Sequence, residues 1–595
     1  KPRPLEGDDE EDGDDKDEKE GDGDSAAGKE SVKKESDDGD DAKEKGDAKD
    51  GGDDDDASEE DEVEPVVIEF ENIGSRIEAF PVGVGHYFAL QATDERLFWL
   101  AFPEGDDDDD DQPGGGILQT FDLQKRRMRG FARGVHGYTM SADRKSLVYE
   151  GSEGLRVVSA GSDGGDEDDT RPSRRSGWVD LGRIAIAIDP RDEWRQMLRE
   201  AWRLMRDQYW HEDLVGIDWD EVWERYSGQL PRVASRSEFS DLVWTMQGEL
   251  GTSHAYEYGG DYRLPPQYPP GHLGADVTWD ADDDAYRIDR IYRGSSWDVS
   301  ERSPLTAPGL NVREGDHIVA VNGRRVCLAH TLQEALVHTA GQEVELLVRG
   351  SDGESKPRTV RTMRSEYPVR YRQWVNDNRR RVHEASGGKL GYIHIPDMSP
   401  HGYAEFHRGF LAELRRDGLV VDVRNNGGGN VSQLILEKLA RTRIGYDVGR
   451  WSAPLPYPEE SIAGPIVAIT DENAGSDGDI FSHCFKLMGI GTLVGKRTWG
   501  GVVGIWPRHR LADGSVVTQP EFAFWFEDVG FGVENWGTMP DVDVELAPQT
   551  ESAGEDAQLD TAIRIALEQF AAKPSALPAF GDSTTIIKPP PRSVP

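Results

Sequence analysis

The pattern of apolar and polar positions divides the chain into successive regions. Residues 1–64 are almost wholly Asp, Glu, Lys, Gly and Ser. Because so few apolar side chains cannot offset the entropy lost when a chain is ordered, the sequence predicts an acidic disordered segment there. Over residues 65–185, short apolar stretches such as HYFALQA, RLFWLAF and GLRVVSA alternate with polar turns. Repeated strand–turn–strand units of this kind are typical of β-propeller blades or of part of a β-sandwich.

The apolar period becomes helical in the region 186–262. Apolar side chains recur every three or four positions from Trp194 to Tyr209, which predicts an amphipathic helix. Ser235 followed by Glu238 forms a capping-box pattern ahead of a second such helix. That helix is expected to end at Gly251, and the polar stretch TSHAYE follows directly. We therefore predict a helical domain.

Three further regions complete the chain. Residues 263–365 contain strand-like stretches such as AYRIDRIY and VELLVRG, which predict a compact β module. Over residues 366–572, apolar strands such as GLVVDVR and PIVAIT alternate with helical patterns and end in the helix AQLDTAIRIALEQF. This alternation favours a partly parallel sheet with covering helices. Residues 573–595 are rich in Pro and Ser and predict a flexible tail. The predicted fold class is multidomain α+β.

Length and charge narrow the classes of protein. A chain of 595 residues is long enough for several domains. Its 114 acidic and 68 basic residues give a formal net charge of −46, which disfavours nucleic acid and membrane surfaces as partners. Cys327 and Cys484 lie far apart in apolar surroundings, as expected of reduced thiols. With no run of about 18 apolar residues and no leader pattern, we expect a cytoplasmic protein.

Ser476 is the first candidate for chemistry. It lies between the expected strand PIVAIT and the expected helix IFSHCFKLMG. At such a junction the helix amides and dipole stabilise a developing negative charge, so the serine could act as a nucleophile. The sequence Gly475-Ser476-Asp477-Gly478 is not a GxSxG elbow, and a simple helix cap is the alternative.

Three other features could complete acyl-transfer machinery. The loop DVRNNGGGN, residues 422–430, could aim backbone N–H groups at an oxyanion, although a tight turn has the same composition. His254 follows Ser253 and could activate a serine, although it is one of 14 histidines. Glu534 lies in the glycine-rich stretch GFGVENWGTMPDV, where a surface turn is the alternative. Neither zinc-ligand spacing nor a nucleotide-binding loop accompanies them, so we predict hydrolysis without a metal or a cofactor.

Taken in order, the motifs GTSHAYE, DVRNNGGGN, NAGSDGD and ENWGTMPDV strongly resemble the tricorn protease family, a relative of the tail-specific C-terminal processing peptidases. The resemblance covers about residues 65–570. It implies that Ser476 is the nucleophile, His254 the general base, and Ser253 with Glu534 a relay that orients His254. It also implies an oxyanion hole formed by backbone N–H groups; the candidates are Asp477, Gly428 and Gly429.

The same resemblance implies a domain order and a substrate class. The family fold has two β-propellers, a helical C1 domain, a PDZ-like β domain and a crotonase-like α/β C2 domain. Here it implies terminal propeller blades at 65–185, C1 at 186–262, the PDZ-like domain at 263–365 and C2 at 366–572. It further implies a homohexamer that cleaves peptides downstream of larger proteases. Asp447 would select a basic P1 side chain, although a solvent-facing turn aspartate is the alternative.

Two other classes of function remain open from the sequence. A crotonase-like acyl-CoA enzyme would also use a glycine-lined oxyanion hole, but it should carry basic groups for the CoA phosphates and does not need the Ser–His pair. A non-catalytic scaffold of propeller blades and a PDZ-like module is the other alternative.

Overall fold

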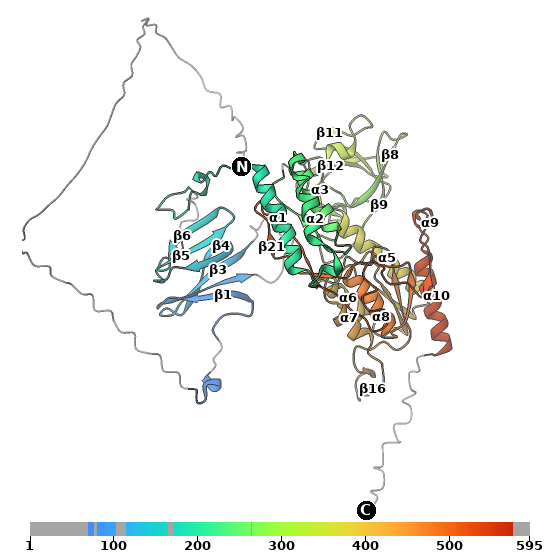
Figure 1. Ribbon diagram of the computed structural model, residues 1–595. Helices are drawn as coiled ribbons and strands as arrows, with labels where there is room; N and C mark the ends of the chain where they lie inside the picture. Colours follow the sequence, from blue (N-terminus) through green and yellow to red (C-terminus); the bar gives the residue numbers. More distant parts are fainter. Residues whose placement is uncertain (1–69, 77–79, 103–114, 165–170, 263–264, 575–595) are drawn as a thin grey trace, which may run out of the picture. The chain divides into compact units, whose positions relative to one another are not determined.

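The computed structural model describes residues 70–76, 80–102, 115–164, 171–262 and 265–574 (Figure 1). The chain forms two compact units, Lys1–Gly83 and Val84–Pro595. In the first unit the described part contains a short 3₁₀ helix, η1 (Ile73–Arg76). The acidic segment 1–64 and all but the first two residues of the predicted tail lie outside the described residues. None of the helices in the described ranges has the length and apolarity needed to cross a membrane.

The second unit begins with a six-stranded antiparallel sheet whose strands lie in chain order. The strands are β1 (His86–Ala92), β2 (Arg96–Phe102), β3 (Gly116–Asp122), β4 (Arg127–Met140), β5 (Ser146–Gly151) and β6 (Gly154–Ser159). The strands expected from the apolar stretches in this region are therefore confirmed. Phe98, Leu118 and Val135 are fully buried and form the centre of the core between these strands.

The helical region contains α1 (Pro190–Gln208), α2 (Trp219–Ser227) and α3 (Arg236–Gly248). The predicted capping pattern is present, since the Ser235 hydroxyl accepts the N–H of Glu238 at 3.2 Å. The Glu238 carboxylate in turn accepts the N–H of Ala234 at 2.7 Å. Helix α2 was not predicted from the apolar period. The three helices share one core, to which Val517 from a later segment also contributes.

The next module is a six-stranded β-sheet with the order β13-β12-β10-β9-β8, in which β11 pairs with β10. The elements are β8 (Ala275–Asp280), β9 (Ala285–Ile291), β10 (His317–Val321), β11 (Arg324–Arg325), α4 (Leu332–Ala335), β12 (Glu343–Arg349) and β13 (Ser355–Arg361). Ile288, Ile318 and Leu346 are fully buried in its core. The predicted β module is confirmed.

The last module is built on a five-stranded parallel sheet in chain order. The strands are β14 (Leu390–His394), β15 (Gly418–Asp422), β18 (Ile466–Thr470), β19 (Thr492–Gly495) and β24 (Val542–Asp543). Right-handed crossovers that always advance in one direction place the connecting helices on one face. That face is covered by α6 (Pro400–Glu413), α7 (Ser432–Leu439) and α8 (Asp477–Leu487), and the other face by α5 (Tyr367–Ala385) and α10 (Ala557–Ala572) (Figure 1).

The remaining elements are short. They are η2 (Leu181–Arg183), η3 (Leu214–Gly216), η4 (Leu230–Arg232), η5 (Pro304–Thr306), β7 (Glu257–Tyr258), β16 (Gly445–Asp447), β17 (Leu455–Tyr457), β20 (Gly504–Ile505), β21 (His509–Arg510), β22 (Val516–Val517), β23 (Pro520–Phe522) and α9 (Pro548–Ser552). Strand β7 follows the helical region and pairs with β22, far along the chain, so it joins the helical region to the parallel-sheet module.

The parallel sheet also determines where its loops meet. Strands β15 and β18 are neighbours and run in the same direction. Their carboxyl ends therefore lie at one edge of the sheet, which is where open α/β sheets place their binding sites. The glycine loop 424–430 follows β15, and the turn that carries Ser476 follows β18.

Candidate active site

Ser476 is the N-cap residue of α8, with φ 55° and ψ −120°. A positive φ is uncommon for a residue with a side chain, and strained conformations of this kind recur at active sites. The hydroxyl makes no capping hydrogen bond with the helix. Its Oγ lies instead 3.1 Å from Nε2 of His254. The helix-cap alternative therefore does not describe what this side chain does.

His254 is buried and is held from several sides. Its own φ is 63°, and its carbonyl accepts the hydroxyl of Thr518 at 2.6 Å. Its ring lies against the rings of Tyr256 and Trp499, with centroids 5.5 and 5.7 Å away. Burial lowers the pKa of His254, and the nearby Glu534 charge acts in the opposite direction. A lowered pKa keeps the imidazole neutral near pH 7, as a general base requires.

Glu534 is surrounded by hydrogen-bond donors. Its Oε1 accepts the N–H of Ser253 at 2.7 Å and the hydroxyl of Thr252 at 3.0 Å. Its Oε2 accepts the N–H of Val502 at 2.6 Å, the N–H of Val503 at 3.1 Å and the hydroxyl of Ser253 at 3.2 Å. A surface turn carboxylate would not be held in this way.

These contacts determine which nitrogen of His254 carries the proton. Ser253 Oγ lies 2.7 Å from Nδ1 of His254 and has one hydrogen to donate. A carboxylate can only accept, so that hydrogen goes to Glu534, and Ser253 Oγ accepts the Nδ1–H of His254. Nε2 is then left as the acceptor that faces the Ser476 hydroxyl.

The glycine loop lies directly beside the Ser476 side chain. A Cβ placed on Gly428 would be 2.5 Å from Cβ and 3.1 Å from Oγ of Ser476. The N–H of Gly428 already donates to Oδ1 of Asn426 at 2.9 Å. Within the described parts of the chain, the N–H groups of Gly429 and Asp477 donate to no protein acceptor. Those two groups are therefore free to bind a ligand oxygen.

The other candidate residues have different surroundings. The Asp477 carboxylate points to Ser432, whose N–H it accepts at 2.9 Å, so only the backbone of Asp477 is free to serve the site. Asp447 is exposed at the end of β16 and pairs with Leu455 in β17. In the described ranges no hydrogen bond or ion pair joins it to Ser476 or His254.

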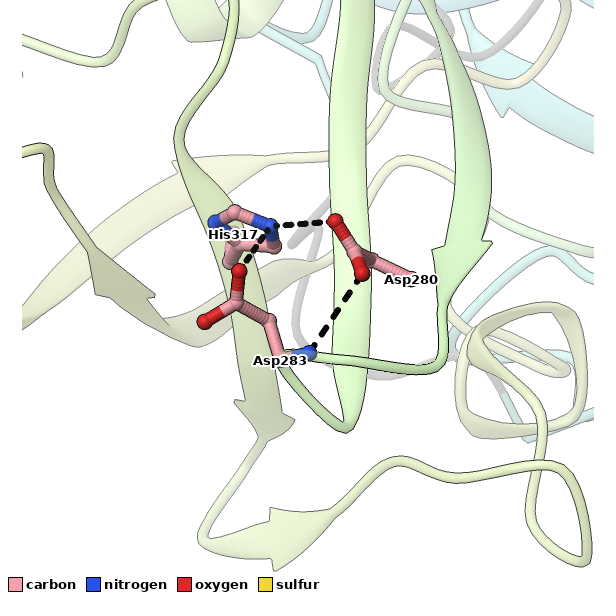
Figure 2. Close-up of side chains that lie close together, drawn as sticks. All are labelled: Asp280, Asp283 and His317. Carbon is pink, nitrogen blue, oxygen red and sulfur yellow. Dashed lines mark hydrogen bonds and ion pairs between the residues drawn. The ribbon is translucent and has the colours of Figure 1, made fainter.

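Among the described residues, one group of His and carboxylate side chains is close enough to hold a metal ion, and it lies in the β module (Figure 2). Nε2 of His317 is 3.3 Å from Oδ2 of Asp280 and 3.4 Å from Oδ2 of Asp283. Asp283 also forms an ion pair with Arg349 at 2.9 Å, and that charge would oppose a bound cation. None of these residues belongs to the Ser476 site.

Several contributors to the site were not predicted. The hydroxyl of Thr252 donates to Glu534, as the hydroxyl of Ser253 does. The sequence could have indicated this contact, because Thr252 is a second hydroxyl residue close to the candidate histidine. Val502 and Val503 contribute only backbone N–H groups, which leave no mark in a sequence. Nothing in the sequence around Trp499 indicated that its ring would lie against the ring of His254.

Three family models match the chain. The one described as Tricorn protease C1 domain matches residues 190–248, Tricorn protease PDZ domain matches 271–365, and Peptidase family S41 matches 389–544. The matches follow the helical region, the β module and the parallel-sheet module in turn. The described parts of these three regions therefore form a multidomain fold of mixed helix and sheet.

Curated proteins and a solved structure give the same relationship. The chain is 44% identical over 86% of its length to Tricorn protease homolog 1 of Streptomyces coelicolor, and 40% identical over 76% to Tricorn protease of Thermoplasma acidophilum. These alignments cover 48% and 41% of the relatives. The crystal structure of the tricorn protease matches with a TM-score of 0.74 and 38% identity, over 82% of this chain and 47% of that one. The chain thus spans about half the length of these relatives.

Proposed function

Because the chain belongs to the tricorn protease family, we propose that it is a serine peptidase that cleaves peptides or unfolded chains through an acyl-enzyme. The observation that carries this proposal is the unbroken series of contacts from Ser476 through His254 and Ser253 to Glu534. A serine hydroxyl is a weak nucleophile unless a base accepts its proton, and this series supplies the base and the groups that orient it.

Each of these residues has a part in the proposed reaction. Nε2 of His254 takes the hydroxyl proton of Ser476 while Oγ attacks the scissile carbonyl carbon. The imidazolium is stabilised through Ser253 by the negative charge of Glu534, and it then protonates the leaving amine. A water molecule, deprotonated by the same nitrogen, attacks the ester of Ser476 and releases the second product.

The oxyanion is assigned to two backbone groups. Gly429 and Asp477 have N–H groups that donate to no acceptor among the described residues, and they flank Ser476 from the glycine loop and from the start of α8. The N–H of Gly428 is occupied by Asn426, so Gly428 serves by lacking a side chain that would displace the nucleophile. Removal of one such donor from an oxyanion hole lowers kcat by about a hundredfold or more.

The remaining features of the proposal concern the whole protein. The sequential antiparallel sheet β1–β6 suits terminal propeller blades, and the one-directional parallel sheet suits a crotonase-like topology. The domain boundaries 186–262, 263–365 and 366–572 are supported by the ranges of the matched family models, and the proposed blades at 65–185 contain the sheet β1–β6. A cytoplasmic homohexamer that acts downstream of larger proteases, with Asp447 selecting a basic P1 side chain, completes the proposal.

Neither alternative function is favoured by a specific contact. An acyl-CoA enzyme or a scaffold has no need for a histidine placed 3.1 Å from a strained serine. The direct test is Ser476→Ala, assayed with short fluorogenic peptides. We expect hydrolysis to fall by several orders of magnitude with an unchanged circular dichroism spectrum. Retention of most of the activity would contradict the serine-peptidase function.

A further inference from the structure

Asp479 is a fully buried carboxylate that the catalytic steps above do not use. It lies in the first turn of α8, three residues after Ser476, and has no exposed surface. Its Oδ1 accepts the N–H of Gly500 at 2.8 Å, and its Oδ2 the N–H of Gly501 at 3.4 Å. The side chain of Thr498 and the backbone N–H of Ser476 also hydrogen-bond to this carboxyl group. It therefore joins the nucleophile turn to the segment 498–503.

Segment 498–503 contacts Glu534, the residue of the candidate relay that is farthest along the series from Ser476. Its Val502 and Val503 donate N–H groups to Glu534, and its Trp499 ring lies against the ring of His254. The same segment packs close to the nucleophile turn, since a Cβ on Gly475 would lie 2.9 Å from the Trp499 ring. A shift of this segment would move Glu534 and the wall behind His254 together.

From these contacts we propose that Asp479 is a positioning residue, which fixes segment 498–503 against the Ser476 turn and thereby places Glu534 and Trp499 on His254. This role rests on the proposed serine-peptidase function. In the described residues no hydrogen bond or ion pair joins Asp479 to His254, so it acts on that ring through the segment that it holds against the Ser476 turn.

The chemistry of the carboxylate suits this role. Burial raises the pKa of Asp479 to about 6, while hydrogen bonds from Thr498, Gly500, Gly501 and Ser476 act in the opposite direction. All four partners point a hydrogen at the carboxyl group, so the ionised form, which only accepts, satisfies them together. An Asn side chain has nearly the same shape, but its NH₂ group would face N–H donors.

The test therefore compares Asp479→Asn with a matched control. Asp316→Asn removes another buried carboxylate, which accepts the N–H of Arg313 at 2.9 Å in the β module. We expect Asp479→Asn to lower kcat about ten- to a hundredfold, the loss that a misplacement of about 1 Å causes. KM should change less than about twofold, because ground-state binding is untouched. Asp316→Asn should leave both constants unchanged.

A second measurement reads the positioning without turnover. The pKa of His254 can be followed by ¹⁵N NMR of labelled histidines, with His254→Ala to assign the signal. The negative charge of Glu534 raises the pKa of this ring, while the groups that contact the ring directly are neutral near pH 7: Ser253, Tyr256, Ser476 and Trp499. Asp479→Asn should lower the pKa of His254 in the same direction as Glu534→Gln.

The two measurements separate the possible failures. A wild-type His254 pKa and a wild-type kcat in Asp479→Asn, even with a lowered melting temperature, would overturn the positioning role. If the wild-type protein hydrolyses no peptide, the proposed function fails, but the pKa of His254 still decides whether Asp479 positions the relay. A lowered pKa in Asp479→Asn and not in Asp316→Asn supports the role in either case.

Discussion

Two of the proposed catalytic residues have backbone conformations that are unusual for residues with a side chain. Ser476 and His254 both have positive φ values, and so do Asn425 in the glycine loop and Asn535 beside Glu534. Asparagine and histidine are found in this region more often than other residues, whereas the conformation of Ser476 costs about 1–3 kcal/mol. The surrounding contacts must hold Ser476 and His254, as the hydrogen bond from Thr518 to the carbonyl of His254 does.

At the same scale, the pH dependence of the reaction should follow His254. The base must be neutral, so kcat/KM should fall as the pH drops through the pKa of His254, which burial places below its ordinary value. Glu534→Gln removes the negative charge that raises this pKa, so the acid limb of the profile should move to lower pH. The plateau of kcat should also fall, because the imidazolium loses its stabilising charge. An acid limb that stays in place would mean that Glu534 does not act on His254.

Asp447 allows a test of specificity. A carboxylate near the P1 side chain should favour Arg or Lys over Leu by about a hundredfold in kcat/KM. A panel of peptides that differ only at P1 measures this preference in the parent protein and in Asp447→Ser. If the parent shows no preference, or if Asp447→Ser keeps it, Asp447 is not the selector.

At the scale of elements, the strand–loop–helix units that carry Ser476 and the glycine loop could be predicted from the sequence. Strands β15 and β18 are short apolar runs that end in glycine-rich stretches, and both are fully buried. Helix α5 was not predicted from the sequence. Its buried face includes Arg372 and Asn378 as well as valines, so the helix has no clear apolar stripe. Periodicity detects helices that pack through apolar side chains and misses those that pack through hydrogen bonds.

The glycine loop provides a matched pair of substitutions. Gly428→Ala places a methyl group 2.5 Å from Cβ of Ser476 at a residue with φ 81°, so it should displace the nucleophile. We expect kcat to fall about a hundredfold or more. Gly427→Ala, next in the chain, meets nothing within 4 Å and has no positive φ. It should retain nearly wild-type activity in the same peptide assay, and equal losses in the two variants would contradict the close approach of Gly428 to Ser476.

At the scale of the second compact unit, the site depends on two modules that are distant in sequence. His254 and Ser476 are 222 positions apart, and their contact depends on the way β7 joins β22. Local sequence patterns identified His254 and Ser476 as candidates, but they contain no information on the distance between the two residues. That the two act together was expected only from the resemblance of the motifs to a known family. Arg236 supports this junction with ion pairs at 2.6 Å to Glu257 of β7 and to Asp513 of the turn after β21.

Removal of Arg236 should weaken that junction. Its side chain is 9% exposed, and those of Glu257 and Asp513 are 1% exposed. Arg236→Met leaves two buried carboxylates without a cationic partner, so the free energy of unfolding should fall by about 3–5 kcal/mol. Arg195→Met breaks only the exposed pair with Asp192 and should change stability little. Chemical denaturation of both variants checks this, and similar small losses would show that the Arg236 network does not stabilise the junction.

The central claim is that His254 activates Ser476 as a nucleophile. A peptidyl phosphonate that carries a basic P1 group, followed by mass spectrometry of the digested protein, tests it most directly. We predict one covalent adduct on Ser476 in the full chain, and a labelling rate that falls by at least about a hundredfold in His254→Ala. An adduct on another residue, or equal rates of Ser476 labelling with and without His254, would contradict the account.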